Sequence, residues 1–145
     1  MNAQTELEEI LIKEAKVESK SENLIRLKSL AERVTAAMGG EVVSRTRNTD
    51  PMSTSIAAKE KVEKELARLQ EEYEQHREFM SSIVDSLRKP AYIKILYGVY
   101  FNGKDLTTVA DQIGYSYRHT QDLRDDAVRA VQKKLDEFEK SHKIS

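Results

Sequence analysis

Apolar residues recur at helical spacing between residues 3 and 36 of the chain. Many of their separations are three, four or seven residues, which places them on one face of an α-helix. The members of this stripe are Leu7, Ile10, Leu11, Val17, Leu24, Leu27, Ala31 and Val34. Glu14 and Ser21 interrupt the stripe, and charged residues fill most other positions. The pattern predicts one long amphipathic helix.

The helical period stops in GGEVVSRTRNTDPMST, residues 39–54, which contains Gly39, Gly40 and Pro51. A connection longer than about 12–15 residues is usually a flexible linker or a functional loop, and we expect one at about residues 37–54. Arg45 and Arg47 can contact phosphate there, although isolated charges in a loop are more often simply solvated.

A cleaner repeat follows over residues 55–88, where the steps between apolar-seam positions alternate four and three. The eight positions are Val62, Leu66, Leu69, Tyr73, His76, Met80, Ile83 and Leu87. A strict heptad is the signature of a coiled coil. Two helices of matched length, each roughly 50 Å at about 1.5 Å per residue, predict an antiparallel hairpin. Because narrow stripes leave little to fill a core, we expect a second copy of the chain to complete the packing at these eight residues, and the hairpin can pack either within one chain or between two.

His76 is the one ionisable imidazole on this seam. It can fix the register or respond to pH. The commoner outcome is a tolerated seam residue whose polar edge stays in water.

Lys89-Pro90 separates the long helices from a region of short ones, since proline favours a helix start. We therefore divide the chain into residues 1–89 and residues 90–145. Residues 90–101 place Ile93, Leu96, Tyr97 and Tyr100 on one face of a helix, and Asn102-Gly103 forms a turn. A second short helix follows, with Leu106, Val109, Ala110 and Ile113 pointing inward.

Two residues then mark the boundary between this short helix and the last one. Gly114 suits the left-handed conformation that ends a helix, and Ser116 is a natural N-cap for the next. We expect that next helix to span residues 117–138. Its predicted core positions are Leu123, Ala127, Val131, Leu135 and Phe138.

Composition limits the classes of function. The chain of 145 residues contains no cysteine, which excludes disulfides and thiolate metal sites and suggests a reducing cytoplasm. It has no apolar run near the roughly 20 residues that span a bilayer, and MNAQTELEEI lacks a signal-peptide layout. The net charge is −1, so bulk charge does not favour nucleic acid. Residues 90–145 carry 9 basic and 8 acidic groups, so DNA binding must depend on local arrangement.

The stretch ILYGVYFNGKDLTTVADQIGYSYRHTQDLRDDAVRAVQKKL resembles region four of bacterial sigma factors. An aromatic-rich helix, a turn, a short helix, a glycine, a capping serine and a longer helix follow in the same order. The matching residues are Leu106, Thr107, Val109, Ala110, Ile113, Gly114, Ser116, Ala127 and Leu135. With the long helical region in front, the chain resembles small phage-encoded, sigma-like regulators, including ArpU-type and RinA-type late-transcription proteins. GYSYRH (114–119) and VTAAMGGEVV (34–43) resemble an uncharacterised family of this group from phages and prophages of Gram-positive bacteria.

This resemblance implies an all-α fold, with a long coiled-coil-like hairpin followed by a sigma-region-four-like helix-turn-helix domain. It implies a transcription regulator in the bacterial cytoplasm, associated with the nucleoid, and some relatives regulate late genes. The partners that it implies are double-stranded DNA and, as an alternative, bacterial RNA polymerase. One departure affects DNA affinity. Relatives commonly carry basic or neutral residues where this chain has Asp122, Asp125 and Asp126.

A recognition helix meets base edges with the residues of its first two turns. With Leu123 inward, Arg118 can bind guanine and Gln121 can bind adenine, each contact discriminating by about 1–3 kcal/mol. Asp122 can accept a hydrogen bond from cytosine, or pair with Arg118, as Asp125 can with Arg129. The remaining DNA-contacting candidates are Lys104, Thr107, Thr108, Ser116, Tyr117, His119 and Arg124.

Three functions remain open: a DNA-binding regulator, a protein-interaction module that binds, for example, RNA polymerase, and a structural phage component. The sequence does not indicate an enzyme, a cofactor or a metal site. The three histidines lie far apart, and neither a glycine-rich phosphate loop nor a G-x-S-x-G motif occurs.

Overall fold

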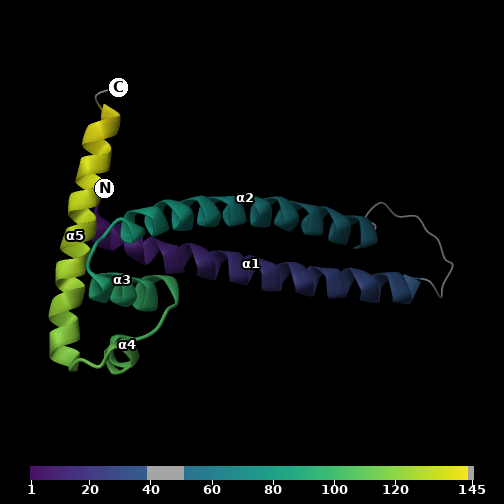
Figure 1. Ribbon diagram of the computed structural model, residues 1–145. Coiled ribbons are helices and arrows are strands. Elements are labelled where there is room, and N and C mark those ends of the chain that lie inside the picture. The colour runs from purple at the N-terminus through teal and green to yellow at the C-terminus, as the bar shows by residue number, and fades with distance from the viewer. Residues whose placement is uncertain (39–50, 144–145) are drawn as a thin grey trace. The chain divides into compact units, whose positions relative to one another are not determined.

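The computed structural model describes residues 1–38 and 51–143, and every element in them is helical. The elements are α1 (Ala3–Met38), α2 (Pro51–Asp85), α3 (Pro90–Leu96), the π-helical turn η1 (Tyr97–Phe101), α4 (Leu106–Ile113) and α5 (Tyr117–Lys143) (Figure 1). The expected all-α class is therefore confirmed for the described part of the chain.

The long helices extend further toward each other than the sequence predicts. α1 continues to Met38 and α2 begins at Pro51, so both ends of the expected 37–54 linker are helical. Proline at the first helical position loses no hydrogen bond, which explains a start at Pro51. The rest of that linker, with Arg45 and Arg47, lies outside the described residues.

Two compact units form, and they do not follow the boundary expected at Lys89. We call residues 1–13 and 73–145 the head unit, and residues 14–72 the two-helix unit. The start of α1 and the end of α2 therefore belong with the short helices. The compact units therefore divide between residues 13 and 14 and between residues 72 and 73, because the apolar residues at those two helix ends pack against residues 90–145.

The head unit has one large apolar core, to which α1, α2, α3, η1 and α5 all contribute. Its buried members are Ala3, Leu7, Ile10, Met80, Ile83, Val84, Leu87, Leu96, Tyr100, Phe101, Ala127, Val131 and Leu135. Full burial of one large aliphatic side chain contributes about 1.5–3 kcal/mol to folding. This core is the main source of stability in the unit.

Three residues predicted to pair copies of the chain lie in this core. Met80 is fully buried, and Ile83 and Leu87 are each 8% exposed. Tyr73 is half-buried and packs against the same core. These side chains have partners within their own chain, so the prediction that they pair two chains is wrong for Met80, Ile83 and Leu87.

His76 lies on the edge of the head unit and faces the start of α1. Its Nε2 is 2.8 Å from the Glu6 carbonyl oxygen, and its Nδ1 is 3.6 Å from the Glu6 carboxylate. The side chain is only 12% exposed. The expectation that its polar edge lies in water is therefore wrong, because both ring nitrogens face Glu6.

The first residues of the chain are fixed on α5. The Ala3 backbone N–H donates to the Gln132 side-chain oxygen at 2.7 Å, and Gln132 Nε2 donates to the Met1 carbonyl at 2.8 Å. The Met1 amine forms an ion pair with Glu139, whose hydrogen bond raises the pKa of that amine. Asn2 accepts from the Thr5 N–H at 3.0 Å and so caps α1.

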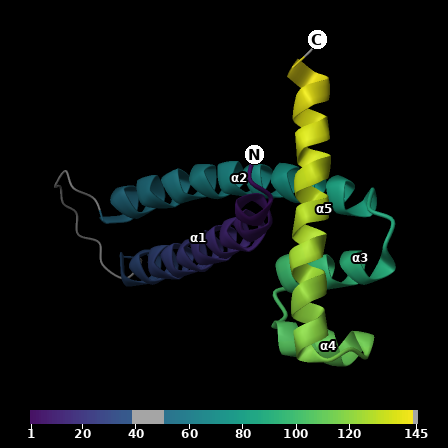
Figure 2. The same cartoon turned by 90° about the vertical axis from the view of Figure 1, so that its left-hand side faces the viewer.

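A second apolar cluster holds α4 in place. Ile95, Leu106 and Val109 are buried together, with Ile113 and Leu123 half-buried beside them. α4 packs on both α3 and α5, and it lies beside the beginning of α5 (Figure 2). Leu106, Val109 and Ala110 are buried, as predicted from the sequence, and Ile113 is half-buried.

The segment 90–101 is not one regular helix, because its second half is the π-helical turn η1. The Asn102 N–H donates to the Tyr97 carbonyl at 2.9 Å, across five residues. Leu96 and Tyr100 are buried as predicted, and Ile93 and Tyr97 are half-buried and pack against the same core. Ile95 and Phe101 are buried in addition, and the extra residue of the π-helical turn changes the helical period after Tyr97.

Tyr97 is held at the margin of the core by polar contacts to α2. Its hydroxyl donates to Asp85 at 2.7 Å and lies 2.6 Å from Ser81 Oγ, and its ring stacks on Phe101 at 4.5 Å. Burial raises the pKa of the Tyr97 hydroxyl. The tyrosine thus connects η1 to the end of α2.

Gly98 lies in η1 where the backbone approaches α4. A Cβ atom built at this position would be 2.8 Å from Val109 Cγ2, closer than carbon atoms tolerate. Val109 is buried at 1% exposure and has little space to move. Glycine at position 98 therefore permits the contact between η1 and α4.

We expect Gly98→Ala to lower the free energy of unfolding by about 1–3 kcal/mol, because it overpacks this contact. Urea denaturation measures the change. In a Val109→Ala background, which removes the opposing methyl groups, the same substitution should cost much less, since alanine otherwise favours helix over glycine. An equal cost in both backgrounds would contradict the close approach.

Candidate nucleic-acid interface

The candidate interface is built from α4, a short turn and the beginning of α5. Asp105 starts α4 by accepting the Thr108 backbone N–H at 2.9 Å. The Thr108 hydroxyl, as the larger cause, and this backbone N–H both lower the pKa of the Asp105 carboxyl. Both donors favour the charged form of the carboxyl at the helix N-terminus.

The turn has the two features that the sequence predicts. Gly114 has a left-handed backbone, φ 79°, and its N–H donates to the Ala110 carbonyl at 2.9 Å. The Ser116 hydroxyl then accepts the His119 N–H at 3.1 Å and caps α5. The predicted roles of Gly114 and Ser116 are confirmed. These two caps stop α4 and start α5 within three residues.

Thr120 is a core residue that the sequence analysis missed. Its side chain is fully buried, and its hydroxyl donates to the Ser116 carbonyl at 2.8 Å. Thr120 precedes Ala127 by seven residues, so it shares a face with that core position. The spacing carried this signal, but a polar residue does not stand out in an apolar stripe. The residue fixes the first turn of α5 on the core.

Arg118 lies on the opposite face of α5 from the buried Ala127, Val131 and Leu135. Its side chain is 84% exposed. The nearest charged partner is Asp122, one turn later, with Arg118 Nε 3.9 Å from the Asp122 carboxylate. The predicted pairing is thus present in a long, solvated form. Such exposed pairs contribute at most about 1 kcal/mol.

The other predicted contact residues of α5 surround Arg118. Tyr117 is 50% exposed, Gln121 is half-buried on the flank, and His119 is exposed. Arg124 is half-buried and lies 3.5 Å from Asp125. The start of α5 therefore presents one largely exposed cation, Arg118, with polar and aromatic residues next to it.

The predicted contacts of the preceding helix lie at its solvent side. Thr107 and Thr108 are exposed on α4, and the backbone N–H of Thr108 is already used by Asp105. Lys104 precedes the helix and donates to the Gln112 side chain at 3.3 Å. All three side chains are accessible to a phosphate group.

Carboxylates outnumber cations across this surface. Residues 104–126 contain Lys104, Arg118 and Arg124, against Asp105, Asp111, Asp122, Asp125 and Asp126. Arg129 pairs with Asp126, so the predicted Asp125–Arg129 pair is not formed. The geometry favours Asp126, which is three residues before Arg129, and Asp125 lies instead near Arg124. The surface has no net positive charge to attract a polyanion.

Tyr115 is a second residue that the sequence analysis missed. It is 45% exposed in the turn, and its ring lies in an edge-to-face arrangement with the His119 ring at a centroid distance of 4.8 Å. Tyr117, two residues later, is also exposed, so two exposed aromatic side chains precede Arg118 in the sequence. An aromatic residue directly after a capping glycine was the available signal.

Within residues 1–38 and 51–143, no three histidine, aspartate or glutamate side chains are grouped to hold a metal ion. Nowhere in those ranges does a helix combine the length and the apolar composition needed to cross a membrane.

Comparison with family models, curated proteins and solved structures returned no match to this chain. The likeness to sigma region four thus depends on the residues quoted above.

The cap of α4 makes stability depend on pH in a defined direction. Because the folded pKa of Asp105 is below its ordinary value of 3.8, its contribution is complete above that value and is lost as pH falls through the folded pKa. We expect Thr108→Val to raise the Asp105 pKa toward 3.8, since it removes the hydroxyl donor. Carboxyl-carbon NMR titration measures the midpoint.

Thr107→Val makes the same change one residue earlier and is the matched control. The Asp105 midpoint should not move in this variant, because the capping bonds come from Thr108. Equal shifts in the two variants would rule out the Thr108 hydroxyl as the cause.

Proposed function

We propose that the chain is a DNA-binding transcription regulator, in which α4 and α5 act as a helix-turn-helix and α5 enters the major groove. The observation that supports this proposal best is the exposed side chain of Arg118 in the first turn of α5. Ser116 caps this helix, a short turn connects it to α4, and the two helices pack together. In this docking mode, the first two turns of the second helix meet the base edges.

In the proposed complex, Arg118 binds guanine through two hydrogen bonds and Gln121 binds adenine. Tyr117, Ser116, Thr107, Thr108 and Lys104 contact the phosphates and orient the helix. Phosphate contacts position a protein, whereas base contacts specify the sequence. The 84% exposure of Arg118 supports this role because the side chain does not have to break a buried contact first.

The carboxylates of α5 limit the affinity of a single head. Non-specific affinity comes from neutralised phosphates, and this surface has more carboxylates than cations. Two linked heads on adjacent half-sites raise the overall affinity without new contacts. We therefore propose that the regulator acts as a dimer or a higher oligomer, with residues 1–89 forming a helical hairpin.

The resemblance to phage sigma-like regulators adds the biological setting. On this basis, we propose a phage or prophage protein that controls late genes in the cytoplasm of a bacterial host, at the nucleoid. Fold alone does not establish a function, so this setting is an analogy from the matched residues.

A protein-interaction module is the second candidate. The exposed Tyr115 and Tyr117 lie beside a carboxylate-rich helix face. Aromatic residues are enriched where proteins contact each other. The acidic face suits a basic protein partner, and RNA polymerase is the partner that the resemblance suggests.

Selection from a random double-stranded DNA library tests the first function. We expect one enriched sequence, and we expect Arg118→Ala to weaken binding to it by about 1–3 kcal/mol. Fluorescence anisotropy measures the difference between the enriched and a scrambled duplex. Circular dichroism checks that the variant is folded.

Arg129→Ala is the matched control, since Arg129 lies eleven residues later on the same face, about 16 Å along the helix. It is 74% exposed and also pairs with an aspartate of α5, Asp126, at a shorter distance of 2.5 Å. Its removal should leave DNA affinity nearly unchanged. Asp122→Asn should strengthen binding and Asp126→Asn should do so less. Equal effects of the two arginine variants would exclude a reading role for Arg118.

Co-purification with bacterial RNA polymerase tests the second function. If the head binds the polymerase through its aromatic group, Tyr115→Ala together with Tyr117→Ala should abolish capture, whereas Arg118→Ala should not. Capture without any enrichment of a DNA sequence would favour this module over the DNA-binding regulator.

A further inference from the structure

The two-helix unit buries its apolar residues poorly. Among the described side chains of residues 14–72, Val62 is the one hydrophobic residue that is buried. Other positions of the two apolar stripes are half-buried, namely Val17, Leu24, Leu27, Ala31, Leu66 and Leu69, and so is the neighbouring Leu30. Two helices alone leave one side of their seam open, so these side chains keep contact with water.

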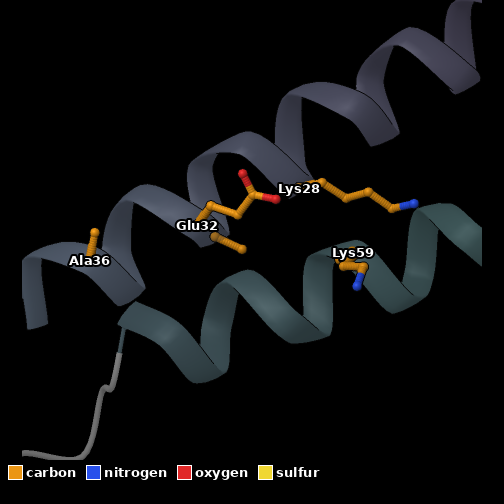
Figure 3. A pocket seen from close by; sticks show the side chains of 5 residues that line it. Lys28, Glu32, Ala36 and Lys59 are labelled. Carbon is orange, nitrogen blue, oxygen red and sulfur yellow. The ribbon is translucent and has the colours of Figure 1, made fainter. Parts of the chain in front are cut away.

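The contacts within this unit show which residues lie opposite each other. Lys20 Nζ is 2.8 Å from the Glu65 carboxylate, which lowers the pKa of Glu65. Further along, Lys28 and Glu32 of α1 line an open depression with Lys59 of α2 (Figure 3). Residue numbers increase on one helix as they decrease on the other, so the two segments run in opposite directions.

This pairing separates the charges of the unit into two halves. The basic half, residues 26–33 and 59–64, contains Arg26, Lys28, Arg33, Lys59, Lys61 and Lys64 against Glu32, Glu60 and Glu63. The acidic half, residues 14–22 and 65–72, contains Glu14, Glu18, Glu22, Glu65, Glu71 and Glu72 against Lys16, Lys20 and Arg68. The net charges are +3 and −3.

We propose that a second copy of this chain covers the open seam, with the two units side by side in opposite directions. The basic half of each copy then faces the acidic half of the other, and four helical segments enclose the half-buried leucines. A two-fold axis relates the copies, as in most homodimers. The proposed dimer interface therefore lies within residues 14–72. It does not include the heptad positions from Tyr73 to Leu87, which belong to the head unit.

The charge pattern identifies the occupant as another copy. A uniformly acidic or basic partner would suit one half and be repelled by the other, because like charges in contact oppose binding. Equal and opposite halves are complementary to their own reversed copy. Ile25, which is 67% exposed near the middle of the unit, adds apolar surface where the two halves meet.

The mass of the full chain in solution, measured by sedimentation equilibrium, tests the proposal. We expect twice the chain mass at tens of micromolar, and weaker association as NaCl rises from about 0.05 M to 0.5 M, because salt screens exposed charges. A monomer under the low-salt conditions would overturn the proposal.

Charge reversal tests the direction of the pairing. Lys61→Glu with Lys64→Glu makes the basic half acidic, and the dissociation constant should rise at least about tenfold. If the copies instead ran in the same direction, like halves would meet, and this variant would associate more tightly. Glu60→Lys with Lys61→Glu is the matched control, since it rearranges charge without changing the net charge of that half.

A mixture of two charge-reversed variants, each with weakened self-association, gives the most specific test of the pairing. Glu18→Lys with Glu22→Lys makes the acidic half basic and should also weaken self-association. Combined with the Lys61→Glu, Lys64→Glu chain, it should form a heterodimer that is tighter than either variant homodimer, because halves of opposite charge meet again. Failure to form the heterodimer, with both variants helical by circular dichroism, would overturn the proposal. DNA affinity is measured separately, so either result leaves the function of the head open.

Discussion

The packing of the first turns of α1 and the last turns of α2 against α5 is the constraint on which the head unit depends. Leu7 and Ile10 from α1, and Met80 and Val84 from α2, are fully buried together with Val131 and Leu135 of α5. Without these contacts, α3, η1 and α4 would leave much of α5 unsupported. The first turns of α1 and the last turns of α2 are thus part of the core of the head unit.

The same packing determines what α5 can present to a partner. Because Thr120, Ala127, Val131 and Leu135 are turned inward, Arg118, Asp122 and Arg129 are turned outward. A cation at the beginning of the helix is followed by carboxylates within two turns. A surface of this kind supports selective contact at Arg118 more than strong attraction to a polyanion, and this balance is why the proposed regulator needs more than one head.

The two units combine the two proposals in one physical scheme. The head unit buries a complete core, whereas the two-helix unit exposes its seam and separates its charges. Association through the two-helix unit would bring two heads into one assembly, at an effective concentration set by the connection between them. Weak binding by each head is then compatible with a selective regulator.

Much of the local structure follows from the sequence alone. Helical spacing identified the long helices, α4 and the core positions of α5, and the cap residues Gly114 and Ser116 were recognisable because their conformations are specific to residue type. The exposure of Arg118 followed from its phase relative to Leu123 and Ala127. Local rules suffice for these features, because each depends on residues within about two turns.

Tertiary contacts decided the rest. A heptad repeat predicts that one face of a helix is apolar but does not predict which segment packs against it. Only the tertiary structure therefore shows that Met80, Ile83 and Leu87 lie in the core of the head unit. The π-helical turn at Tyr97–Phe101 has no local period, and the close approach of Gly98 to Val109 joins residues eleven apart. The sequence therefore determined the helices and their exposed faces, whereas the partner of each apolar face was decided by contacts between distant segments.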